Sequence, residues 1–69
     1  MISYKKLWIR LLEQGMTKQQ LVKEAGFSLS TLTKLNRNEY VSMTVLVSIC
    51  HVLKCDIGDI MEVISENEE

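Results

Sequence analysis

Apolar residues recur at helical spacing through most of the chain, and capping residues bracket each run. In the first run the large apolar side chains stand at Tyr4, Leu7, Trp8, Leu11 and Leu12. The spacing i, i+3, i+4, i+7, i+8 is that of one face of an amphipathic helix. Ser3 is a candidate N-cap before this run, and Gly15 follows it where a left-handed C′ residue is favoured. The pattern therefore predicts a first helix that ends just before Gly15.

A second helix is predicted over about 18–25. Thr17 and Gln20 have the spacing of a capping box, and Met16 and Leu21 are placed to form a hydrophobic staple around it. The side chains expected to be buried are Leu21, Val22 and Ala25. Gly26 ends the run, because glycine adopts the positive φ that a helix C′ position requires.

Three further helices complete the predicted fold. Ser28 can cap the third, which runs to about Arg37 with Leu32 and Leu35 facing inward. Ser42 can cap the fourth, whose buried stripe comprises Val45, Leu46, Ile49, Cys50 and Leu53. Asp56 can cap a short fifth that carries Ile57, Ile60, Met61 and Ile64. The expected architecture is a compact all-α, five-helix domain over 1–65, followed by a frayed acidic tail over 66–69.

Two short helices joined by a tight glycine turn, crossing near a right angle, form a helix-turn-helix. In this arrangement the start and outer face of the third helix stay exposed. The polar residues there are Ser28, Ser30, Thr31, Thr33, Lys34, Arg37 and Asn38, with Leu29 among them. Short hydroxyl side chains at a helix N-terminus allow close approach to a groove, and the N-terminal N–H groups favour a phosphate.

Size and charge permit nucleic-acid binding without requiring it. The 69 residues suffice for one domain, and the formal net charge is −1. Three of the nine acidic residues, however, are Glu66, Glu68 and Glu69 in the tail. Between residues 17 and 40 four basic side chains face two acidic ones. The middle of the chain is therefore mildly basic.

Two stretches of the chain resemble the Cro/repressor, or Xre-like, helix-turn-helix domains, above all the small stand-alone bacterial and phage-borne regulators. They are MTKQQLVKEAGFSLSTLTKL (16–35) and VSMTVLVSICHVLKCDIGDIMEV (41–63). The resemblance covers about 2–64. It implies that Thr17 and Lys18 contact backbone phosphates, and that Arg37 or Asn38 contacts them again. It also implies that Ser28, Leu29, Ser30 and Lys34 meet base edges, with Thr31 a weaker candidate. Leu29 departs from the family, whose better-known repressors have a polar reader there.

The remaining chemistry-bearing residues have structural interpretations. Tyr4 and Trp8 lie on the apolar stripe and are expected in the core, whereas His51 is expected on a helix surface. Asp56 and Asp59 fall at a helix start, where capping favours acids. Cys50 and Cys55 have no second pair for zinc and are expected to be free, buried thiols. No metal site, cofactor, small-molecule substrate or catalytic pair is predicted, so an enzyme is not expected.

The favoured hypothesis is a cytoplasmic, sequence-specific DNA-binding regulator that acts as a homodimer on double-stranded DNA, with repression favoured over activation. No apolar run approaches the ~18 residues that would cross a membrane. The alternative is a protein-binding domain on the same scaffold, such as an antitoxin-like or antirepressor partner. An exposed Leu29 and the modest charge suit that alternative.

Overall fold

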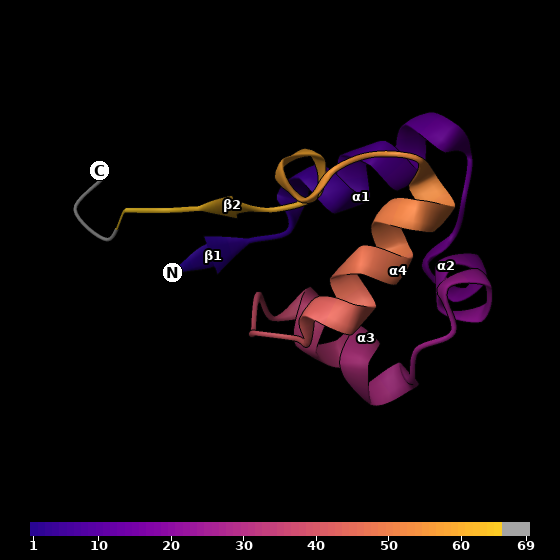
Figure 1. Ribbon diagram of the computed structural model, residues 1–69, viewed down its shortest axis with the longest axis horizontal. Helices are drawn as coiled ribbons and strands as arrows, with labels where there is room; N and C mark the ends of the chain where they lie inside the picture. The colour runs from indigo at the N-terminus through magenta and orange to yellow at the C-terminus, as the bar shows by residue number, and fades with distance from the viewer. Residues whose placement is uncertain (66–69) are drawn as a thin grey trace.

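The computed structural model describes residues 1–65, and the predicted acidic tail over 66–69 lies outside these described residues. Four α-helices surround the core, and a two-stranded sheet joins the two ends of the described chain (Figure 1). The elements are β1 (Ile2–Ser3), α1 (Lys5–Gln14), α2 (Lys18–Ala25), α3 (Leu29–Asn36), α4 (Met43–Leu53), the 3₁₀ turn η1 (Ile57–Asp59) and β2 (Glu62–Val63). Within residues 1–65 no helix is long and apolar enough to cross a membrane.

Side-chain caps start three of the helices where the sequence predicted them. The hydroxyls of Thr17, Ser28 and Ser42 each accept a hydrogen bond from the backbone N–H three residues later, at 3.1–3.2 Å. At Thr17 the capping box is complete, because the Gln20 side-chain oxygen accepts from the Thr17 N–H at 2.7 Å. Each such cap stabilises its helix by about 1 kcal/mol. The predicted boundaries of α2 are therefore confirmed.

The first helix departs from its prediction at both its start and its face. Tyr4 is the N-cap residue and makes no side-chain cap, while the Ser3 hydroxyl accepts from the Lys5 N–H at 3.1 Å. Leu7 and Leu11 are buried, but Leu12 is 82% exposed. The predicted stripe was wrong at Leu12, since α1 buries a narrower face than five apolar positions implied.

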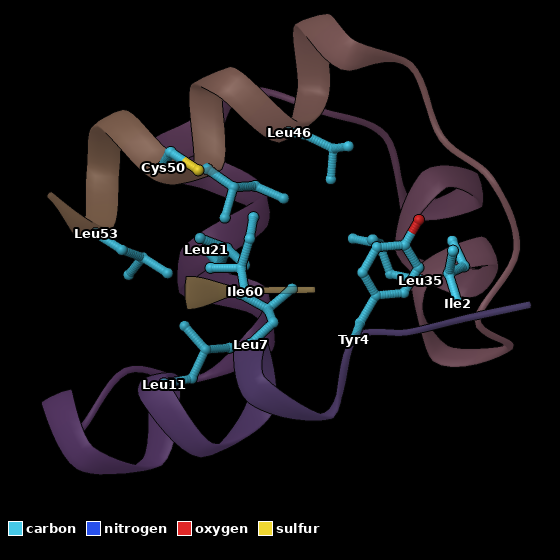
Figure 2. Close-up of a cluster of buried hydrophobic side chains, with 11 residues drawn as sticks. Ile2, Tyr4, Leu7, Leu11, Leu21, Leu35, Leu46, Cys50, Leu53 and Ile60 are labelled. Atoms are coloured by element: carbon cyan, nitrogen blue, oxygen red, sulfur yellow. The ribbon is translucent and has the colours of Figure 1, made fainter. Parts of the chain in front are cut away.

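The core of the described residues is filled by side chains from all four helices, from the segment before α1 and from the segment after α4 (Figure 2). The buried members are Ile2, Tyr4, Leu7, Leu11, Leu21, Leu35, Leu46, Ile49, Cys50, Leu53 and Ile60. Trp8 packs against this cluster while remaining partly exposed. In a domain this small each fully buried leucine contributes several kcal/mol, so truncating Leu35 to alanine would cost about 2–5 kcal/mol.

Tyr4 ties the N-terminal segment to the turn that follows α3. Its hydroxyl donates to the Glu39 carbonyl at 2.8 Å, and its backbone N–H donates to the Asn38 side-chain oxygen at 3.0 Å. Asn38 holds a left-handed φ of 57°, which asparagine tolerates better than most residues. Burial raises the pKa of the Tyr4 hydroxyl. The predicted core position of Tyr4 is confirmed.

The predicted fifth helix was wrong. Residues 57–59 form a single 3₁₀ turn, in which the Asp59 carboxylate accepts from the Asp56 N–H at 2.9 Å, and the chain then extends. Glu62 and Val63 of β2 pair antiparallel with Ser3 and Ile2 of β1. The spacing of the isoleucines suited a helix, but the main chain of β1 offers a hydrogen-bonding partner that short-range periodicity does not reveal. The all-α prediction is therefore corrected to four α-helices with a small sheet.

Candidate nucleic-acid interface

The turn between α2 and α3 depends on one glycine. Gly26 has a φ of 74°, and its N–H donates to the Val22 carbonyl at 2.9 Å. The Phe27 N–H donates to the same carbonyl at 3.3 Å. A left-handed φ costs a residue with a Cβ about 1–2 kcal/mol, which explains the glycine. This turn sets α3 against α2, with Leu21 and Leu35 buried beneath (Figures 1 and 2).

A cluster of hydroxyls covers the first turn of α3. The Ser28 oxygen accepts from the Thr31 N–H at 3.1 Å and lies 2.9 Å from the Ser30 hydroxyl and 3.1 Å from the Thr31 hydroxyl. The backbone N–H groups of Leu29 and Ser30 have no acceptor among residues 1–65. The N-terminus of α3 therefore presents free donors and small side chains to an approaching anion.

Leu29 projects from the same turn and is 66% exposed. Its backbone carbonyl accepts from the Thr33 hydroxyl at 3.1 Å, so the next turn of α3 also shows a short polar side chain. An exposed leucine between serines offers one apolar contact point within an otherwise polar surface. Such a side chain can meet a thymine methyl group but cannot form a hydrogen bond with a base.

Lys34 and Arg37 lie one helical turn apart and are both exposed. Within residues 1–65 neither side chain is held by an ion pair or a hydrogen bond. Residues spaced by three project from neighbouring positions on one helix face. Two unpaired cations therefore extend the polar surface of α3 from its start to its end.

Lys18 at the start of α2 is held by contacts from two other helices. Its Nζ lies 4.1 Å from the centroid of the Trp8 ring and donates to the Asn36 side-chain oxygen at 2.7 Å. The cation–π contact and the hydrogen bond restrict a side chain that would otherwise sample many rotamers. The charge is thereby fixed near the start of α2 and the end of α3.

Known proteins resemble this chain in both sequence and structure. A family model described as the Cro/C1-type HTH DNA-binding domain matches residues 6–66. The chain belongs to this family. A solved structure described as "Crystal structure of transcriptional regulator VanUg, Form II" is similar at a TM-score of 0.90 and 49% sequence identity, covering 94% of this chain and 87% of that one. No curated protein matches.

As a member of this family, the Cro/C1-type protein binds double-stranded DNA and takes part in transcription regulation. The family is one of DNA-binding regulators, in keeping with the expectation that the chain is not an enzyme. The predicted resemblance to Cro/repressor domains is confirmed.

The residues predicted to contact DNA from the sequence do not all have free side chains in this Cro/C1-type domain. Ser28, Ser30 and Thr31 come together in the hydroxyl cluster, with Leu29, Lys34 and Arg37 exposed beside and beyond it. Thr17 uses its hydroxyl as a helix cap, and Lys18 donates to Asn36. Asn38 accepts from the Tyr4 N–H, which leaves Arg37 as the freer of the two candidates at the end of α3.

Trp8 and Asn36 are the two residues of this surface that sequence reasoning missed. Both act on Lys18, one from α1 and one from the last turn of α3. No local spacing connects these three positions, so no sequence pattern would have identified the contact.

The histidine and the two cysteines lie outside this surface, in the last turn of α4 and directly after it. His51 is exposed, as predicted. Cys50 and Cys55 are both free thiols, but only Cys50 is buried, so the prediction of burial was wrong for Cys55. Among residues 1–65 no group of histidine, cysteine and acidic side chains is placed to hold a metal ion.

Proposed function

We propose that the chain is a sequence-specific transcriptional repressor that inserts α3 into the major groove of its operator. The observation that carries this proposal is the outer surface of α3. Within residues 1–65 its two cations, Lys34 and Arg37, are unpaired, and its first N–H groups have no acceptor. A surface that keeps donors and cations unsatisfied suits a polyanionic ligand.

Base recognition falls to the first two turns of α3. Lys34 can donate to O6 and N7 of a guanine, and Leu29 can contact the methyl group of a thymine. The hydroxyls of Ser28, Ser30 and Thr31 can rotate to donate to or accept from base edges or phosphates. Specificity then comes from one cation, one apolar side chain and the adaptable hydroxyl cluster.

Phosphate contacts frame this recognition surface at both ends. Lys18 and Thr17 lie at the start of α2, and Arg37 and Asn38 lie at the end of α3. Because Trp8 and Asn36 already restrict Lys18, this lysine loses less rotamer freedom on binding than a free lysine would. Such contacts fix the register of α3 on the duplex without reading the sequence.

Two copies are needed for a specific site in a genome. A single module of this size buries about 600–1,000 Å² on DNA and contacts only a few base pairs. We therefore infer a homodimer on an operator whose half-site centres lie about 34–36 Å apart. Occupying a promoter blocks transcription without a further contact surface, which favours repression over activation.

A charge reversal tests the placement of α3. Fluorescence anisotropy would compare the wild-type protein with the double variant Lys34→Glu, Arg37→Glu on a labelled duplex. Each lost contact is worth about 1–3 kcal/mol, so the double variant should bind at least about 30-fold more weakly. A control for one charge reversal is Lys54→Glu, directly after α4, whose C-terminal end lies away from α3 (Figure 1), and this variant should lose much less affinity than either single reversal at Lys34 or Arg37. If the double variant and the Lys54→Glu control lose the same affinity for DNA, the placement of α3 in the major groove is wrong.

The exposure of Leu29 supports a second candidate, a protein-binding domain on the same scaffold. A solvent-exposed leucine at a helix tip offers an apolar anchor to a protein partner. If this candidate is correct, Leu29→Ala abolishes partner binding while the charge reversal at Lys34 and Arg37 has little effect. The DNA proposal predicts the opposite order of effects.

A further inference from the structure

The end of α4 closes in a motif that brings two cysteines together. Lys54 takes a left-handed φ of 56°, and its N–H donates to the Cys50 carbonyl. The Cys55 N–H donates to the same carbonyl at 3.0 Å. A bond between these two positions is the 6→1 bond of a Schellman motif, which is frequently accompanied by a contact between the side chains of the two residues. At these two positions apolar residues are usual, whereas here both residues are cysteines, and both line the same surface hollow.

The two thiols differ in their surroundings. Cys50 is buried against the core, while Cys55 is only partly buried (Figure 2 shows Cys50 on α4). Burial, and then the neighbouring Cys55 thiol, raise the pKa of Cys50 to about 11. An open surface hollow of about 740 Å³ is lined by both cysteines together with His51 and Lys54. A small reagent can therefore reach the pair from solvent at this hollow.

We propose that Cys50 and Cys55 form an intramolecular disulfide when the protein meets a hydroperoxide. The site is separate from the DNA surface, since α3 lies beside the other end of α4 (Figure 1). The proposal does not depend on the proposed function, because it rests on the geometry of the helix end alone.

The reaction balances with one molecule of hydrogen peroxide. The more exposed Cys55 sulfur attacks a peroxide oxygen, the O–O bond breaks, and Cys55 becomes a sulfenic acid with loss of water. The Cys50 sulfur then attacks the Cys55 sulfur, the S–O bond breaks, and a second water leaves with the Cys50 proton. Two thiols are oxidised and one peroxide is reduced to two waters. A resolving thiol beside the sulfenic acid keeps Cys55 from further oxidation.

Mass spectrometry of the peroxide-treated protein tests the proposal. The intact monomer should lose 2 hydrogens, about 2 Da in mass. Trypsin cleaves after Arg37 and Lys54, so Cys50 and Cys55 fall in separate peptides, 38–54 and 55–69. In the oxidised protein these two peptides should be joined, and a reductant should separate them. The wild type should also stay monomeric on a non-reducing gel.

Two single variants complete the test. In Cys50→Ala the Cys55 thiol should accumulate sulfenic and sulfinic acid, which add about 16 and about 32 Da, because its resolving partner is gone. In Cys55→Ser, which changes no fully buried side chain, the Cys50 thiol should stay reduced at the same peroxide dose. If the wild type instead gains about 16 or 32 Da, keeps both thiols or forms linked dimers, the proposal is wrong.

Discussion

Replacing Gly26 by alanine isolates the conformational requirement of the helix-turn-helix turn. Gly26 has a φ of 74°, and a Cβ built there would meet no heavy atom within 4 Å. The substitution therefore introduces backbone strain without steric overlap. Gly58 provides a matched control, since a Cβ there also meets nothing and its φ is not in the left-handed region.

The expected magnitudes follow from two opposing effects. An alanine at positive φ costs about 1–2 kcal/mol. Any Gly→Ala change also removes unfolded-state entropy and stabilises the protein by about 0.4–1 kcal/mol. Gly58→Ala should show only this gain, while Gly26→Ala should show a net loss of up to about 1.5 kcal/mol. Since the entropy gain is common to both, the two variants should differ by about 1–2 kcal/mol.

Urea denaturation followed by helical circular dichroism measures this difference, and a thermal melt provides a second value. For a domain of this size a change of about 1 kcal/mol shifts Tm by about 4–8 °C. Gly26→Asn should recover part of the loss, because asparagine tolerates the left-handed region. If Gly26→Ala and Gly58→Ala have the same unfolding free energy within about 0.3 kcal/mol, well below the strain of about 1–2 kcal/mol, the turn does not need glycine and the reasoning fails.

Three further predictions concern single residues. The raised pKa of Cys50 means that the folded state disfavours its thiolate, so under reducing conditions its contribution to stability should be full below pH 9 and fall as the pH rises to about 11. Urea midpoints at about pH 8 and about pH 10.5 should lie closer together in Cys50→Ala than in the wild type, the remaining difference including the buried Tyr4 hydroxyl, and an unchanged pH dependence in Cys50→Ala would contradict this. Asn38→Ala removes the acceptor for the Tyr4 N–H and should lower the unfolding free energy by about 1–3 kcal/mol, whereas a purely DNA-contacting Asn38 would leave urea denaturation unchanged. Once an operator is known, replacing the thymine that faces Leu29 by deoxyuridine should weaken binding about four-fold, which is the value of one buried methyl group. In an anisotropy titration Leu29→Ala should bind the two duplexes equally. A wild-type protein that does not distinguish the two bases would refute the contact.

Local sequence patterns predicted the helix boundaries well because the responsible interactions are themselves local. The caps at Thr17, Ser28 and Ser42 act over three residues, and the glycines at 15 and 26 take the left-handed conformation within a single turn. A pattern of a few residues contains all the information that such interactions need.

The C-terminal segment shows where local patterns fail. Ile57 and Ile60 have helical spacing, and Ile60 is indeed fully buried. After Ile60, however, the chain pairs with β1 at the opposite end of the sequence. Val63 consequently lies 80% exposed on the strand. Pairing between distant segments cannot be deduced from the period of one of them.

The candidate site likewise has a part that the sequence pattern predicts and a part that depends on distant contacts. The exposed positions of α3 follow from its cap and its two inward leucines, so a single helix contains their pattern. The restraint on Lys18 involves Trp8 of α1 and Asn36 of α3, and the engagement of Asn38 depends on Tyr4. These contacts arise only once the helices pack. The sequence therefore predicts where the surface lies, but it does not predict which side chains of that surface are already engaged in contacts within the protein.

The salt dependence of DNA binding tests the central claim most directly. Anisotropy titrations of the wild-type protein on a labelled duplex would be repeated across a series of salt concentrations. With about four phosphate contacts, the logarithm of the association constant should fall against the logarithm of salt with a slope of about −3.6. A flat salt dependence, or no binding at low salt, would contradict the account and favour a protein partner at Leu29.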